Sequence, residues 1–137
     1  MKTYVIDTNA LISFVTDRNL AQQKKIADLF DGAVRLKNTI LCPQNALTEF
    51  VYVLDKVYTT PKQQIRSMIK DFLKLPGIKV LNEVDFESVL DFWPDKLPDF
   101  GDANVASVCR SNKGAIAATF DRKLINALKK SKIAVAS

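Results

Sequence analysis

The chain has 137 residues, the usual size of one domain, and its 47% hydrophobic and 26% charged residues are ordinary for a globular protein. Only four glycines and five prolines are present, so a fibre or a disordered chain is excluded. The net charge is +5, and the absence of histidine excludes Ser–His and Cys–His catalysis and histidine-ligated zinc.

Short apolar runs alternate with longer amphipathic segments along the chain. Short runs bounded by Asp, Pro or Gly are typical of buried strands, and apolar residues spaced three and four apart are typical of helices. Gly32 is expected to end the second helix. Short strands that alternate with helices predict an α/β domain with a mostly parallel sheet. In chain order we predict a strand at 4–6, helices at 10–15 and 20–30, a strand at 40–42, helices at 44–58 and 61–75, a strand at 79–81, helices at 86–93 and 101–110, a strand at 115–120, a helix at 122–129 and a strand at 133–135.

Positive charge is concentrated at the end of the sequence. Residues 1–109 have a net charge of −1, whereas residues 110–137 have a net charge of +6. A basic end on a near-neutral body suits an anionic partner such as nucleic acid. A solvated surface that keeps the protein in solution is an equally good interpretation. The candidate residues for binding the phosphates of a nucleic acid are Arg110, Lys113, Arg122, Lys123, Lys129 and Lys130.

Two features indicate the cellular compartment. Cys42 and Cys109 form no CxxC motif, so we expect buried free thiols, which are typical of a reducing compartment. No apolar run approaches the roughly 18 residues that a membrane span needs. Asp7 and Asn9 interrupt the apolar N-terminus too early for a signal peptide. We therefore expect a cytoplasmic protein with no membrane partner.

Carboxylates stand where predicted strands end and predicted helices begin. Asp7 ends the first strand, Asp121 follows the fourth, and Asp99 and Asp102 flank the start of the helix before that strand. Each could simply cap a helix, because Asp is a favoured N-cap residue and complements the helix dipole. Glu49 lies on the opposite side of its helix from the apolar stripe and could be an ordinary surface residue.

The joint position of these acids also suggests a catalytic site. The carboxyl ends of parallel strands form one edge of a sheet, and ligands bind there. Carboxylates about 4 Å apart repel by roughly 4 kcal/mol per pair at an effective dielectric constant of 20, so a cluster of them needs a cation. Mg²⁺ or Mn²⁺ fits oxygen ligands without His or Cys. Such a site suits the attack of water on a phosphodiester, with a basic rim holding the substrate backbone.

Four segments resemble, in order, the motifs of the PIN-domain family. YVIDTNAL at 4–11 resembles the opening motif, LTEF at 47–50 the second acidic motif, DFGDA at 99–103 the third, and ATFD at 118–121 the last. The match covers essentially the whole chain, and the length resembles that of the VapC-type toxins of bacterial toxin–antitoxin pairs. Asn104 departs from the family pattern, in which this position is mostly apolar.

The resemblance implies a fold, an activity and partners. It implies a single PIN-like domain over residues 1–137, with a three-layer α/β/α fold and a central, mostly parallel sheet. It also implies an endoribonuclease that depends on Mg²⁺ or Mn²⁺, forms a homodimer, and is inhibited by a cognate antitoxin protein that binds DNA. The helix at 61–75 resembles the arm that carries dimer and antitoxin contacts. By position, the catalytic and metal-binding acids are Asp7, Glu49, Asp102 and Asp121, and the supporting residues are Asn9, Asp99 and Thr119.

Other interpretations stay open. The chain could be a PIN-fold binding module without catalysis, or a housekeeping RNA-processing nuclease instead of a toxin. A phosphoacceptor domain is a third class, with Asp7 accepting the phosphoryl group. Receiver-like domains, however, carry their acids on other strands. A dehalogenase-like phosphatase would need a second Asp where Asn9 stands.

Overall fold

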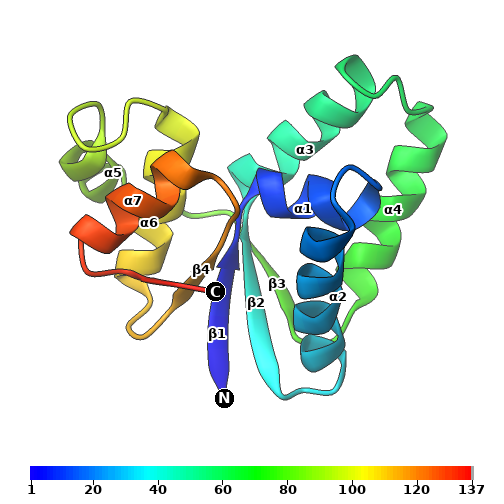
Figure 1. Ribbon diagram of the computed structural model, residues 1–137, viewed down its shortest axis with the longest axis horizontal. Coiled ribbons are helices and arrows are strands. Elements are labelled where there is room, and N and C mark those ends of the chain that lie inside the picture. Colours follow the sequence, from blue (N-terminus) through cyan, green and yellow to red (C-terminus); the bar gives the residue numbers. More distant parts are fainter. Residues whose placement is uncertain (137) are drawn as a thin grey trace.

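A five-stranded parallel sheet with the order β3-β2-β1-β4-β5 forms the centre of the computed structural model, which describes residues 1–136 (Figure 1). Tyr4 of the central strand is level with Ile40 on one side and with Ile116 on the other. The strands are β1 (Lys2–Ile6), β2 (Asn38–Pro43), β3 (Ile78–Leu81), β4 (Ile116–Ala118) and β5 (Ala134–Val135). The helices are α1 (Thr8–Val15), α2 (Leu20–Val34), α3 (Gln44–Lys56), α4 (Lys62–Lys74), α5 (Phe86–Phe92), α6 (Phe100–Ser111) and α7 (Arg122–Lys130).

Helices cover both faces of the sheet. Figure 1 shows α1 to α4 on one side and α5 to α7 on the other. Successive residues of a strand point to opposite faces, so Val5 packs in a core with Val105 and Leu124, whereas Ile6 packs in a second core with Ile26. The three-layer α/β/α fold with a parallel sheet, predicted from the sequence, is therefore confirmed.

Several predicted boundaries differ from the structure by two residues or more, and two of them concern how an element ends. Gly32 does not end the second helix: α2 continues to Val34, and the chain reverses at Leu36, whose φ is 59°. A glycine inside a helix costs about 1 kcal/mol relative to alanine, which is too little to end a helix by itself. The fourth strand ends at Ala118 instead of residue 120.

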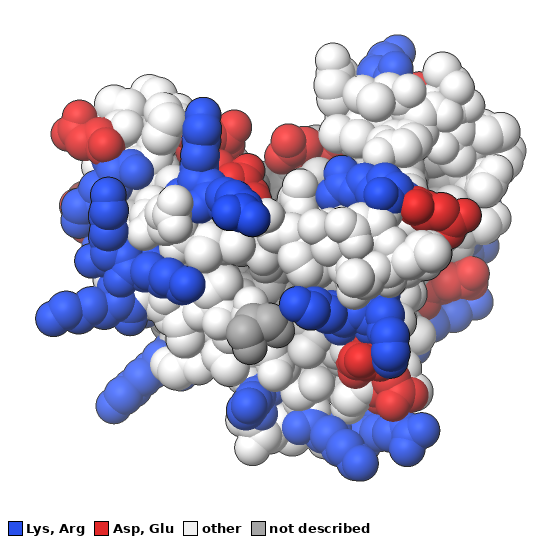
Figure 2. All heavy atoms as spheres, viewed as in Figure 1, with Lys and Arg blue, Asp and Glu red and all other residues white. Residues whose placement is uncertain are grey.

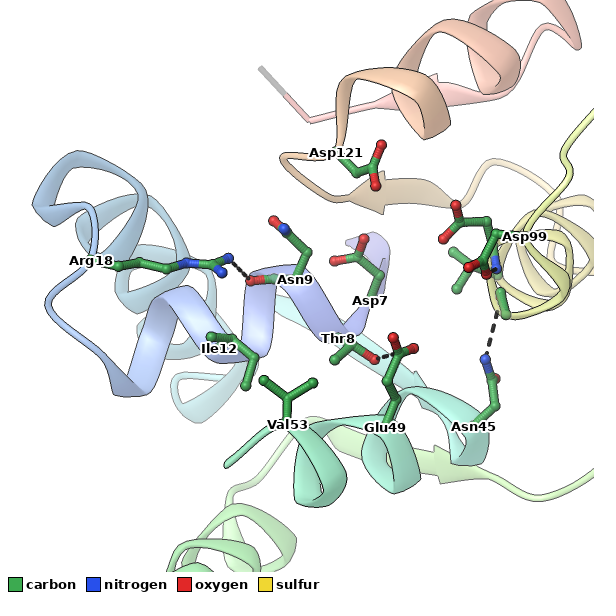
Figure 3. A pocket seen from close by; sticks show the side chains of 13 residues that line it. Asp7, Thr8, Asn9, Ile12, Arg18, Asn45, Glu49, Val53, Asp99 and Asp121 are labelled. Atoms are coloured by element: carbon green, nitrogen blue, oxygen red, sulfur yellow. Dashed lines mark hydrogen bonds between the residues drawn. The ribbon is translucent and has the colours of Figure 1, made fainter. Parts of the chain in front are cut away.

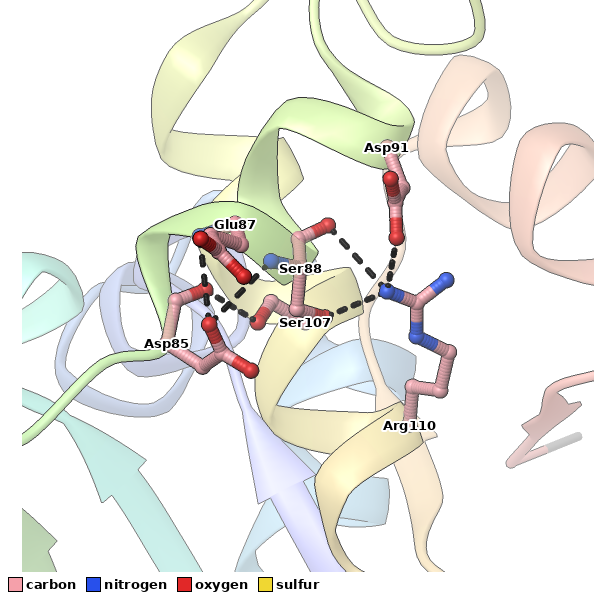
Figure 4. Close-up of polar contacts among 6 residues, drawn as sticks. All are labelled: Asp85, Glu87, Ser88, Asp91, Ser107 and Arg110. Carbon is pink, nitrogen blue, oxygen red and sulfur yellow. Dashed lines mark hydrogen bonds and ion pairs between the residues drawn. The ribbon is translucent and has the colours of Figure 1, made fainter.

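A polar cluster joins α5 to α6 (Figure 4). Arg110 of α6 donates to the Ser88 hydroxyl at 2.7 Å and pairs with Asp91 at 2.6 Å, both on α5. Its guanidinium group lies 4.9 Å from the centre of the Phe92 ring. Ser107, which lies one turn before Arg110 on α6, donates to the Asp85 carbonyl at 3.4 Å. Arg110 therefore holds two helices together, although the sequence suggested an RNA contact.

Both cysteines are free and buried, as predicted. Burial raises the pKa of the Cys42 and Cys109 thiols to about 12, and the negative charge of Asp7 adds to the effect at Cys109. Both thiols are therefore protonated and unreactive at neutral pH. Within residues 1–136, no helix combines the length and the apolar character needed to cross a bilayer.

Candidate active site

A pocket of about 210 Å³ opens beside the carboxyl ends of β1 and β4. Figure 3 shows Asp7, Glu49 and Asp121 turned towards this space from three different elements. Figure 2 shows acidic side chains in a hollow between two lobes of the surface, with basic side chains on both sides. The structure thus brings together the predicted acids, and those that line the pocket are Asp7, Glu49, Asp99, Asp102 and Asp121.

Three of these aspartates also cap helices. The Asp7 carboxylate accepts from the Ala10 N–H at 2.9 Å at the start of α1. Asp99 accepts from the Asp102 N–H at 2.9 Å, and Asp121 accepts from the Leu124 N–H at 3.1 Å. The capping interpretation is therefore confirmed. Each cap uses one carboxylate oxygen, so the second oxygen of each aspartate can make another interaction.

Asp7 is the most buried of the acids, with an exposed fraction of 5%. Its second oxygen accepts a hydrogen bond from the Thr119 hydroxyl. Burial raises the pKa of Asp7 to about 6, although the bonds from Thr119 and from the Ala10 N–H lower it, and the charges of Asp121 and Glu49 raise it further. The loss of hydration thus outweighs both hydrogen bonds.

Asp102 lies in the first turn of α6 and is partly buried. The pKa of Asp102 is raised to about 7, mainly by burial and also by the neighbouring charges of Asp99, Asp121, Asp7 and Glu49. Two strongly raised pKa values in one pocket are typical of a functional site, because stability alone does not favour crowded carboxylates.

Glu49 reaches the pocket from α3. Its side chain is exposed, which agrees with a surface position, but it lines the pocket. Glu49 accepts from the Thr8 hydroxyl at 3.3 Å, and the same hydroxyl donates to the Ala46 carbonyl at 2.9 Å. Thr8 therefore ties the start of α1 to α3 and holds Glu49 beside the aspartates.

The donor set of the pocket fits a hard divalent cation. Its ligands are carboxylate and amide oxygens, with no histidine or cysteine. The side-chain oxygens of Asn9 and Asn45, which also line the pocket, are buried without a hydrogen-bond partner. Within residues 1–136, no three acidic or cysteine side chains are already gathered as a metal-binding group. The acids therefore share a pocket without forming a closed coordination shell.

The predicted basic residues divide into two groups. Arg122 and Lys123 begin α7 directly after Asp121, and Lys129 and Lys130 end the same helix. Lys113 instead precedes β4, at the opposite end of the sheet from the pocket, and Arg110 lies in the cluster between α5 and α6. The structure therefore places the basic residues of α7, and not these other two, on the element that starts at the pocket.

Three polar residues that line the pocket were not predicted from the sequence: Thr8, Arg18 and Asn45. Arg18 donates to the Asn9 carbonyl at 2.8 Å (Figure 3). This bond holds the positive charge of Arg18 at the rim of the pocket. Asn45 donates to the Gly101 carbonyl at 3.3 Å and so joins α3 to α6. Thr8 lies within the opening motif and was detectable there. Arg18 and Asn45 carry no sequence signal, because only the fold brings them to the pocket.

The protein is an α/β protein whose parallel sheet has a cluster of carboxylates at the carboxyl ends of its strands. The chain belongs to the PIN domain family, whose family model matches residues 4–130. PIN domains are generally nucleases and typically use divalent metals, so the chain is placed in a superfamily of enzymes that hydrolyse nucleic acids. No curated protein matches the chain.

Three solved structures share the fold at low sequence identity. PAE2754 from Pyrobaculum aerophilum is 22% identical, with a TM-score of 0.61 over 92% of this chain and 86% of its own. VapBC2 from Rickettsia felis, solved bound to a DNA fragment from its promoter, is 17% identical, with a TM-score of 0.69 over 98% and 97%. The PIN domain endonuclease Utp24 is 17% identical, with a TM-score of 0.56 over 98% and 85%.

Proposed function

We propose that this protein is a metal-dependent endoribonuclease that cleaves phosphodiester bonds in RNA. The observation that carries the proposal is the pocket in which Asp7, Glu49, Asp102 and Asp121 line one space at the carboxyl edge of the sheet. Family membership supports nucleic acid as the substrate class. A basic helix, α7, begins at the same edge and supports an anionic polymer as the substrate.

Asp7, Glu49, Asp102 and Asp121 would hold Mg²⁺ or Mn²⁺. A bound ion would lower the pKa of a water molecule and stabilise negative charge on the phosphate. The Thr119 hydroxyl orients the Asp7 carboxylate, and Asp99 fixes the first turn of α6 from which Asp102 projects. Asn9 adds an amide oxygen to the same space.

Within this proposal the biological role is that of the toxin of a type II toxin–antitoxin pair. The likeness in fold to VapBC2 over nearly all of both chains supports it. Protein partners are also supported by two exposed apolar side chains on α5, because Phe86 and Leu90 are 60% and 57% exposed and lie one helical turn apart. We propose that exposed apolar surface of this kind contacts a second copy of the chain or an antitoxin protein.

An RNA-processing nuclease is the second candidate, supported by the fold shared with the endonuclease Utp24. It uses the same site and chemistry and differs only in substrate and partner. A binding module without catalysis is the remaining alternative. It predicts that a metal ion stabilises the protein without any cleavage of RNA.

The test is cleavage of a mixed RNA pool by pure protein with Mn²⁺ or Mg²⁺, compared with EDTA. The pool is treated in parallel with Asp102→Asn and with Asp17→Asn, a control that removes an exposed carboxylate outside the pocket. Metal-dependent cuts that Asp17→Asn keeps and Asp102→Asn loses support the proposal. Cuts of equal strength in all three proteins contradict it. Metal-induced stabilisation without cuts favours the binding module.

A further inference from the structure

A second and larger hollow lies next to the candidate active site. It measures about 720 Å³, compared with about 210 Å³ for the carboxylate pocket. Its walls are α2 and α7, and the end of β4 forms part of its floor. In Figure 1 these two helices lie on either side of the C-terminal end of the described chain. We call this hollow the α2–α7 groove.

The rim of the α2–α7 groove is basic. Lys25 of α2 and Arg122 and Lys129 of α7 line it, and all three side chains are exposed. None of the three forms an ion pair with another residue of the range 1–136. Asp28, the acid on the rim, pairs with Lys24 at 3.5 Å. Figure 2 shows basic side chains to the left and to the right of the centre of the molecule, in the same view as Figure 1. The groove therefore carries uncompensated positive charge.

The groove and the carboxylate pocket meet along one short segment of the chain, residues 119–122, although no residue lines both. Thr119 lines the groove, and its hydroxyl group holds the Asp7 carboxylate. Two residues later Asp121 lines the pocket, and Arg122 lines the groove. From Arg122 to Lys129, α7 rises about 10 Å, and Arg122 is at the end of the helix that lies nearest the carboxylate pocket. A strand in the groove would therefore lead directly to the carboxylates.

The floor of the groove is apolar and includes one aromatic ring. Phe120 and Ile125 are half-buried and line it together with Leu29. Grooves that bind single strands combine a basic track for phosphates with apolar and aromatic surface for bases. An acidic protein segment would match the positive charge of the rim as well, so it is one outcome of the test below. The nucleic acid is favoured because the groove ends beside the pocket in which we propose that a phosphodiester bond is cleaved.

We propose that the α2–α7 groove binds the single-stranded RNA that flanks the cleaved bond, with Lys25, Arg122 and Lys129 contacting its phosphates. The inference rests on the proposed function, since it takes the carboxylate pocket as the place of cleavage. It also divides the basic residues of α7: Lys129 contacts the RNA, whereas Lys130, its neighbour outside the groove, does not.

The experiment measures binding of a short, fluorescently labelled single-stranded RNA to the full chain in EDTA, over a series of salt concentrations. Lys129→Gln is paired with Lys130→Gln, and Lys25→Gln is paired with Lys37→Gln, an exposed lysine outside the groove. We expect each groove variant to weaken binding about three- to tenfold and to reduce the slope of log K against log salt by about 0.7. Each control is expected to bind like the wild type.

Equal losses in the groove variants and their controls would overturn the proposal, because binding would then follow total charge. Unchanged binding in both groove variants would overturn it as well. A polyglutamate probe that binds as tightly as the RNA, and loses affinity in the same variants, would assign the groove to an acidic protein segment instead. Because EDTA prevents metal-dependent cleavage, a failure here is distinct from a failure of the proposed function, which the metal-dependent cleavage assay tests separately.

Discussion

The Thr119 hydroxyl group donates a hydrogen bond to the Asp7 carboxylate, 112 positions away in the sequence. The same hydroxyl oxygen accepts from the Asp121 N–H at 3.1 Å. Thr119 therefore connects two acids that end neighbouring parallel strands. It also explains why β4 stops at Ala118: the next residues turn to form these bonds instead of extending the ladder.

Replacement of Thr119 by valine tests this connection. Thr119→Val keeps the shape but leaves a buried Asp7 oxygen without a donor, so we expect the free energy of unfolding to fall by about 1 to 3 kcal/mol. The pKa of Asp7 should rise further, because the Thr119 hydroxyl lowers it. Chemical denaturation and an NMR titration of the carboxyl carbon measure the two effects. Thr119→Ser should restore both, and an unchanged Asp7 pKa in Thr119→Val would contradict the assignment.

The stability of the metal-free protein should depend on pH in a defined direction. The pKa of Asp7 rises from 3.8 to about 6, and that of Asp102 to about 7, so the folded chain binds more protons than the unfolded chain between these values. The free energy of unfolding should therefore decrease as the pH rises from about 4 to 7. Asp7→Asn should weaken this dependence on pH, because it removes one of the two carboxyl groups whose pKa is raised in the folded protein. Denaturation across the pH range measures this, and Asp17→Asn should retain the wild-type dependence.

Divalent ions should stabilise the folded protein through the carboxylate pocket. At about 100 times the dissociation constant, a ligand adds about 2.7 kcal/mol, which raises the Tm of a domain of this size by several degrees. We expect this increase with Mg²⁺ or Mn²⁺ at pH 7 and a much smaller one in Asp102→Asn. Differential scanning calorimetry provides the measurement. An equal increase in Asp102→Asn would place ion binding elsewhere.

Two substitutions of Asp121 separate capping from chemistry. Asparagine is also a favoured N-cap residue, so Asp121→Asn should keep α7 and change stability by less than about 0.5 kcal/mol. Asp121→Ala removes the cap and should cost about 1 kcal/mol. Both variants should lose RNA cleavage, because both remove the charge from the pocket. Full cleavage by Asp121→Asn would reduce this residue to a helix cap.

Arg110 should matter for stability and not for RNA binding. Arg110→Gln removes its ion pair with Asp91 and its contact with the Phe92 ring, at an expected cost of about 1 kcal/mol. Its affinity for single-stranded RNA should equal that of the wild type, since Arg110 lines neither the pocket nor the α2–α7 groove. Denaturation and binding measurements on one preparation decide between the two roles.

The order of strands and helices could be predicted from the sequence because periodicity is a local property. The apolar runs at residues 4–6 and 40–42 lie in β1 and β2. The acids that follow predicted strands line one pocket. This second success has a topological reason: parallel strands end at the same edge, so the chain position of Asp7 and Asp121 already implied their proximity.

Other features were decided by the tertiary structure alone. Arg110 and Lys129 are both basic and near the end of the chain, yet one joins two helices and the other lines a groove. Lys25 faces the same groove from a helix nearly a hundred residues earlier. Arg18 reaches the pocket only because a loop folds back over α1. These positions depend on how helices pack across the sheet and where each side chain points, and a linear pattern of residue types contains neither.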